Sequence, residues 1–185
     1  MLERALITHA SPTLAGLKAG SLFSVPCGGA ALTAEVRRLN AMLLPRGLRL
    51  MTLRRDAHRA LLYLCRDQAL RETLRRPDVQ ALLRRCGYSA FTPGAAIRTL
   101  RARLASSGGF PHEIGIFLGY PLADVIGFIR NGGRNCLCSG CWKAYANAPE
   151  ALRTFARIRK CRAVYARRFA EGCPLSRLAV RTTAP

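Results

Sequence analysis

The sequence has few acidic residues. Only 10 of its 185 residues are Asp or Glu, against 30 Lys and Arg, and the formal net charge is +20. A field this positive attracts polyanions such as nucleic acid at low salt, whatever the function of the protein. Nearly all of the basic residues are arginines, which a GC-rich genome would favour without functional meaning. Such a genome does not explain the shortage of acids.

Signals for export and membrane insertion are also missing. The first twenty residues lack the features of a secretory signal peptide, namely a basic start, a long apolar stretch and a cleavage site of small residues. The longest apolar runs, such as 60–65 and 114–118, fall well short of the roughly 18 to 20 residues that span a bilayer. We therefore expect a cytoplasmic protein that does not enter the membrane, with its eight cysteines reduced. Half of the residues are hydrophobic, so a core can form without disulfides or metal.

No familiar catalytic signature is present, and the sequence indicates no enzyme class. The residues around Lys18 lack the glycine spacing of a P-loop, and there is no nucleophile elbow or dinucleotide-binding fingerprint. His112 and Glu113 begin an H-E-x-x-H pattern, but position 116 is isoleucine. We expect Glu113 to stabilise the start of a short helix. The alternative is a polar site in which His112 and Glu113 act together as acid and base or as ligands.

The order of the predicted elements indicates an α+β fold. Apolar periodicity, prolines and glycines predict a short helical turn at 11–16, a strand at 21–25, a helix at 33–44, a hairpin at 48–65 with its turn at 56–59, two helices between 67 and 87, a helix at 93–104, two short helices after Pro111 and Pro121, a strand at 141–146 and a long helix at 148–171. This order predicts one domain over residues 1–173, a small, mostly antiparallel sheet covered by several helices. We expect residues 174–185 to be a loose C-terminal tail.

A cysteine cluster is the most informative chemical feature. The run Asn-Cys-Leu-Cys-Ser-Gly-Cys-Trp at 135–142 contains Cys136, Cys138 and Cys141. Closely spaced thiolates bind structural zinc or an iron–sulfur cluster, and the fourth ligand would come from Cys27, Cys161, Cys173 or a histidine.

Two other interpretations of the cluster remain open. Cys138 and Cys141 have the spacing of a dithiol redox motif. Alternatively, some of these cysteines are small buried hydrophobic residues. The leading hypothesis is a small accessory protein that handles a metal or electrons, with a redox protein as its partner.

The long C-terminal helix suggests a second function. Phe155, Ile158, Tyr165 and Phe169 form an apolar stripe that Arg162 interrupts. On the opposite face lie four basic residues: Arg153, Arg157, Lys160 and Arg167. This face is either a nucleic-acid-binding surface or an ordinary solvated helix face, since no groove-reading motif accompanies it.

Three segments carry a resemblance to a known family. The stretch Phe110–Ile129, with the segment Pro12–Lys18 and the motif Cys138–Lys143, resembles the signature of an uncharacterised bacterial family, the DUF 3793 family. The likeness extends to the hairpin region and covers nearly the whole chain. It implies a cytosolic protein of organisms that tolerate oxygen poorly, where iron–sulfur or flavin-linked redox work is favoured, but it supplies no established activity.

Overall fold

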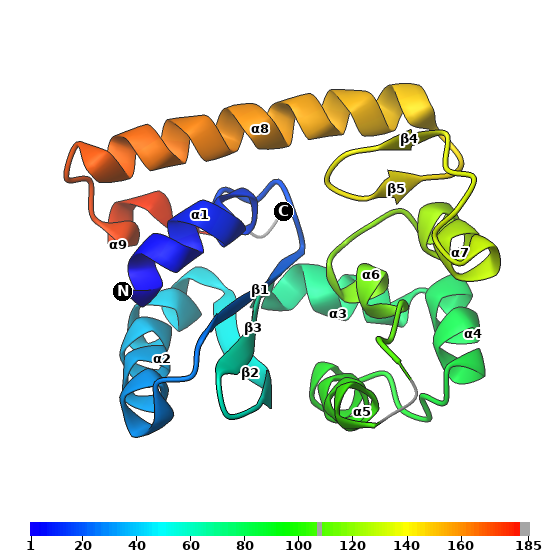
Figure 1. Ribbon diagram of the computed structural model, residues 1–185, viewed down its shortest axis with the longest axis horizontal. Coiled ribbons are helices and arrows are strands. Elements are labelled where there is room, and N and C mark those ends of the chain that lie inside the picture. Colours follow the sequence, from blue (N-terminus) through cyan, green and yellow to red (C-terminus); the bar gives the residue numbers. More distant parts are fainter. Residues whose placement is uncertain (107–108, 182–185) are drawn as a thin grey trace.

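The computed structural model describes residues 1–106 and 109–181 and shows the α+β fold that the sequence predicts (Figure 1). Its elements in chain order are α1 (Leu2–Leu14), β1 (Gly20–Pro26), α2 (Gly29–Leu43), the 3-10 turn η1 (Leu44–Arg46), β2 (Leu48–Arg55), β3 (Arg59–Arg66), α3 (Asp67–Arg75), α4 (Pro77–Arg85), α5 (Pro93–Ala105), α6 (Ile114–Phe117), α7 (Leu122–Asn131), β4 (Cys138–Ser139), β5 (Lys143–Ala144), α8 (Ala148–Ala170) and α9 (Leu175–Leu178). Within the described ranges, no helix is both long and apolar enough to cross a membrane.

The main sheet has three antiparallel strands in the order β1-β3-β2. The predicted hairpin at 48–65 is confirmed as β2 and β3, with a bulge between Thr52 and Arg54. Side chains alternate between the two faces of the central strand β3. Leu62 and Leu64 join the core formed with α1, α2 and α9, whereas Tyr63 and Cys65 join the core formed with helices α3 to α7. The sheet therefore separates two hydrophobic cores.

Helix α8 lies across α1 and across the β4–β5 hairpin (Figure 1). Asn147 caps the start of the helix, because its side chain accepts a hydrogen bond from the Glu150 backbone N–H. The apolar stripe predicted for this helix faces inward. Phe155 packs in a small third core beneath the hairpin, while Tyr165 and Phe169 pack against the core on α1. This helix thus connects the two ends of the molecule.

The N-terminal prediction was wrong in one respect. The helix begins at Leu2 instead of Ser11, and Pro12 lies in its last turn. Leu2, Leu6 and Ala10 are buried at helical spacing, which stabilises the first two turns. Pro12 has no backbone N–H, so the helix loses one hydrogen bond there. The Pro12 carbonyl accepts hydrogen bonds from the N–H groups of Leu17 and Lys18. A Ser-Pro pair that looked like a helix start is therefore inside a helix.

The C-terminal prediction also needs correction, as far as residue 181. Helix α9 follows Pro174, and Leu175, Leu178 and Ala179 are buried against α1. The guanidinium of Arg66 donates hydrogen bonds to the carbonyls of Leu14 at 2.7 Å and Val180 at 3.0 Å. This stretch is packed because its apolar residues complete the hydrophobic core formed with α1 and α2. Residues 182–185 of the predicted tail lie outside the described part of the chain.

Candidate functional site: a pocket beside the cysteine hairpin

The cysteine cluster lies on a tight hairpin, residues 136–144, which we call the cysteine hairpin. It consists of two-residue strands, with Cys138 paired to Ala144 and Ser139 to Lys143, in place of the single strand predicted at 141–146. Gly140 is at its tip, where a Cβ atom would overlap the ring of Phe155. The backbone can therefore approach α8 closely only because this residue is glycine.

Two of the three clustered cysteines, Cys138 and Cys141, pack against the small third core around Phe155. Cys136 lies near Tyr145, and its charge contributes, after burial, to the raised pKa of that tyrosine. The Cys138 sulfur is 4.0 Å from the carbonyl of Ala148, and Cys141 lies beside Lys18. In residues 1–106 and 109–181, no three His, Cys, Asp or Glu side chains form a group that could hold a metal ion. The structure therefore adds no ligand set to the predicted zinc or iron–sulfur centre, which stays a prediction.

Distant segments meet at Tyr120. The Lys18 ammonium lies over its ring, 4.9 Å from the centroid, and the Trp142 ring stacks on it at 5.1 Å between centroids. The Tyr120 hydroxyl donates a 3.1 Å hydrogen bond to the carbonyl of Cys141. These residues come from the three segments on which the family resemblance rests. Lys18, Tyr120 and Trp142 were not selected from the sequence, although the resemblance drew attention to all three segments.

Burial shifts the protonation of this cluster. It lowers the pKa of Lys18 to about 8, with the nearby Cys141 opposing the shift and Arg162 adding to it. Burial also raises the pKa of Tyr120 to about 12. The chain has only three lysines, of which Lys18 lies over Tyr120 and Lys143 directly follows Trp142 on the cysteine hairpin. Unlike arginine, a buried lysine can lose its proton near neutral pH.

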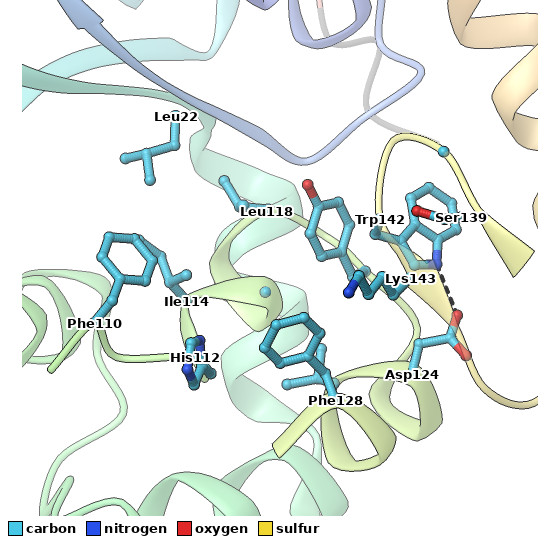
Figure 2. Close-up of a pocket in the computed structure, with 14 residues that line it drawn as sticks. Leu22, Phe110, His112, Ile114, Leu118, Asp124, Phe128, Ser139, Trp142 and Lys143 are labelled. Carbon is cyan, nitrogen blue, oxygen red and sulfur yellow. Dashed lines mark hydrogen bonds between the residues drawn. The ribbon is translucent and has the colours of Figure 1, made fainter. Parts of the chain in front are cut away.

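A pocket of about 380 Å³ opens between the cysteine hairpin, α6 and α7 (Figure 2). Figure 2 shows Phe110, Ile114, Phe128 and Trp142 arranged around it. Most of its lining is apolar or aromatic, and the full set is Leu22, Phe110, His112, Ile114, Gly115, Leu118, Tyr120, Asp124, Val125, Phe128, Ser139, Gly140, Trp142 and Lys143. Of this set, only His112 was proposed from the sequence as a candidate site residue.

Asp124 fixes the wall of the pocket that carries Trp142. Its carboxylate is buried and accepts hydrogen bonds from the indole N–H of Trp142 at 2.8 Å, from the Tyr145 N–H at 2.7 Å and from the Ala146 N–H at 3.1 Å. Both carboxylate oxygens are therefore occupied by the protein itself. Asp124 connects α7 to the hairpin and is not free to bind a ligand.

His112 and Glu113 lie in different environments. The His112 ring is exposed at the pocket, 4.9 Å from the Phe128 ring between centroids, and makes no hydrogen bond to another described residue. Glu113 is buried, is paired with Arg103 and accepts a 3.2 Å hydrogen bond from the Tyr88 hydroxyl. Burial and this carboxylate raise the pKa of Tyr88. The two side chains considered together as a polar site thus have separate partners.

The basic face of α8 is exposed. Arg153, Arg157, Lys160 and Arg167 all lie on the solvent side of the helix. Only the outer two have acidic partners: Arg153 is 2.6 Å from Glu150, and Arg167 is 3.9 Å from Glu171. Arg157 and Lys160 have no ion pair with any other described residue. The middle of the face is therefore not neutralised by the protein's own acids.

The fold and the pocket define a small α+β protein with an aromatic pocket walled by a cysteine hairpin. A family model described as "Protein of unknown function (DUF3793)" matches residues 6–179, so the chain belongs to this family. No curated protein matches the chain. No solved structure matches it either. The resemblance predicted from the sequence is confirmed, and the family's description supplies no activity.

Proposed function

We propose that this protein binds a small, largely aromatic molecule that carries an acidic group. The observation that supports this proposal is the 380 Å³ pocket, which lies within the usual size range for small-molecule sites and is mostly apolar with few polar groups. Phe110, Phe128 and Trp142 offer ring surfaces to an aromatic ligand. The pocket is formed by segments distant in sequence, which the fold brings together.

The polar groups of the pocket favour an acidic ligand. Lys143 donates one hydrogen bond, at 2.6 Å, to the carbonyl of Gly133, which leaves two ammonium protons for a ligand. His112 has both ring nitrogens available to hydrogen-bond a ligand. The one carboxylate among the described lining residues, that of Asp124, already accepts three N–H groups of the protein. A carboxylate on the ligand would find a cation and a hydrogen-bond donor here.

The single tryptophan of the chain, Trp142, reports directly on this pocket. We would titrate the protein with 2-naphthoate and with the neutral 2-naphthylmethanol, following Trp142 emission and equilibrium dialysis. We expect saturable binding of one equivalent, with 2-naphthoate preferred. Lys143→Met should remove that preference, whereas the control Lys160→Met on α8 should keep it. Absence of saturable binding, or an equal loss in both variants, would contradict the proposal.

The basic face of α8 supports a second candidate function, nucleic-acid binding. Its support is the charge of Arg157 and Lys160, which form no ion pair within the described part of the chain and lie in the middle of an exposed face. The test compares two variants with the same loss of charge, measured by the salt dependence of binding to a single-stranded oligonucleotide. One neutralises the face: Arg153→Gln, Arg157→Gln, Lys160→Gln and Arg167→Gln. The other neutralises four exposed arginines elsewhere: Arg4→Gln, Arg37→Gln, Arg85→Gln and Arg130→Gln. Equal weakening in the two variants would leave only non-specific attraction.

A further inference from the structure

A second cavity, of about 890 Å³, lies between β2, α3 and α5, and arginines line it. Five of its fifteen lining residues are arginines, namely Arg49, Arg71, Arg75, Arg98 and Arg101. That is one residue in three, compared with 30 lysines and arginines among the 185 residues of the chain. The lining contains one acid, Asp67. We call this cavity the arginine groove, and no motif in the sequence pointed to it.

The arginines of the groove fall into two groups. Arg49 donates to the carboxylate of Asp67 at 2.8 and 3.0 Å, and this pairing uses the single acid. Arg101 donates to the backbone carbonyl of Thr52 at 2.8 Å. The other three, Arg71, Arg75 and Arg98, are exposed and make no hydrogen bond or ion pair with another described residue. Their charge is available to a bound anion.

The bottom of the groove is apolar. Leu70, Leu74 and Ile97 are buried there, and Met51 and Phe91 are partly buried beside them. The guanidinium of Arg84 lies over the Phe91 ring, 4.8 Å from its centroid, which helps to hold the ring in place. The groove therefore combines an apolar base with three free guanidinium groups, so it suits a ligand with one flat apolar part and one strongly anionic part.

We propose that the arginine groove binds a nucleoside 5′-polyphosphate, with its phosphates on Arg71, Arg75 and Arg98 and its base on the apolar floor. Guanidinium groups bind phosphate oxygens through paired hydrogen bonds, and a site with several of them recognises more than one phosphate. The volume is within the range of cofactor-sized sites. The groove shares no lining residue with the pocket beside the cysteine hairpin, so this proposal is independent of the proposed function.

The test measures binding of ATP to the full chain at 150 mM salt, using a fluorescent ATP analogue and competition by unlabelled compounds. The groove variant is Arg71→Gln, Arg75→Gln and Arg98→Gln. The control variant, Arg4→Gln, Arg37→Gln and Arg130→Gln, removes the same charge from exposed arginines that lie outside both the groove and the basic face of α8. We expect the groove variant to raise Kd by roughly tenfold or more and the control to change it less than about twofold.

Competitors separate the possible ligands. We expect ATP to compete better than adenosine and better than inorganic tripolyphosphate, because base and phosphates both contribute. A 5′-phosphorylated oligonucleotide that competes more strongly than ATP, and whose binding the groove variant abolishes, would overturn the assignment to a free nucleotide. Equal weakening in the groove and control variants would also overturn it, as would tripolyphosphate competing as well as ATP. Thermal unfolding of each variant would show that the fold is retained.

Discussion

The indole N–H of Trp142 donates a 2.8 Å hydrogen bond to the buried carboxylate of Asp124, which joins the cysteine hairpin to α7. The same carboxylate accepts two backbone N–H groups just after the hairpin. One side chain thus determines where the wall of the pocket lies.

Replacement of Asp124 should therefore loosen this wall. Asp124→Ala leaves three partly buried N–H donors without their acceptor, and we expect a loss of about 1 to 3 kcal/mol in the free energy of unfolding. Asp124→Asn should cost less, because its carbonyl oxygen can still accept from the backbone N–H groups. Chemical denaturation followed by Trp142 emission checks this, with Asp56→Asn in the exposed turn as the control. Equal stability of Asp124→Ala and the parent would contradict the assignment.

His112 and Glu113 should behave differently when each is changed. Glu113→Gln removes the buried charge that faces Arg103 and Tyr88, and we expect a loss of about 2 kcal/mol in the free energy of unfolding. His112→Ala should change stability by less than about 0.5 kcal/mol, because the ring is exposed and makes no hydrogen bond to a described residue. The same variant should weaken 2-naphthoate binding. Equal losses of stability would show that the two residues act as one structural unit.

The lowered pKa of Lys18 predicts a pH dependence of stability. In the unfolded chain the amine keeps its proton up to about pH 10.5, whereas in the folded chain it loses the proton above about pH 8. Between these values the unfolded state binds more protons, so the Lys18 contribution makes the fold more stable as pH rises. Below pH 8 the charged, buried amine costs up to about 3 kcal/mol.

Comparison with Lys18→Met isolates this contribution. Cys65 acts in the opposite direction, because burial raises the pKa of its thiol to about 12 and the unfolded thiol loses its proton first, above pH 9. Subtracting the two unfolding curves cancels that effect. We expect Lys18→Met to be more stable than the parent at pH 7 and the difference to shrink towards pH 10. A difference that stays constant from pH 7 to 10 would show that Lys18 does not titrate with a lowered pKa.

Two helical glycines should respond to alanine with opposite signs. A Cβ at Gly127 on α7 would lie 2.5 Å from the Tyr145 side chain, so Gly127→Ala should cost about 1 to 3 kcal/mol despite the higher helix propensity of alanine. A Cβ at Gly94 on α5 would meet only the end of the flexible Arg98 side chain, at 3.9 Å. Gly94→Ala should therefore stabilise the protein by about 0.5 to 1 kcal/mol. Thermal unfolding of both variants shows whether each substitution lowers or raises the stability.

The predicted thiolate centre has its own test. Protein purified without oxygen should contain stoichiometric zinc or iron if Cys136, Cys138 and Cys141 bind it, and the metal should be lost when all three become serine. Cys86→Ser is the control for a thiol outside the cluster, and loss of metal in Cys27→Ser or Cys173→Ser would identify a fourth ligand. If the protein is free of metal and the triple replacement leaves its stability unchanged, the hypothesis of a thiolate metal centre is contradicted.

The elements that local patterns determine were predicted well. The alternating apolar residues of 48–65 and the proline and capping residues around 148 indicate a hairpin and a helix whatever surrounds them. The start of α1 was missed because Ser11-Pro12 is a strong local start signal, whereas the burial of Leu2 and Leu6 depends on distant partners. The packing of Leu175 and Leu178 was missed for the same reason.

The candidate site was only partly predictable. The cysteine cluster was found because its residues are close in sequence, but in the described part of the chain no three His, Cys, Asp or Glu side chains form a group that could hold a metal ion. The meeting of Lys18 with Tyr120 joins segments about a hundred residues apart, which no local pattern reveals. The arginines of the groove likewise come from three elements, β2, α3 and α5, and each alone looked like one of many in a basic chain.

Arg66 donates hydrogen bonds to the carbonyls of both Leu14 and Val180. It thereby holds the end of α1 beside the C-terminal end of the described chain. Closing so large a loop is slow, because the entropy of the intervening chain must be lost before the contact forms. During synthesis, β1 and β3 can cover one side of α1 early, but the side that packs against α8 and α9 remains at least partly exposed until both helices have been made. Nascent or truncated chains that end before residue 175 therefore expose that apolar face and should aggregate or be degraded more readily than the full chain.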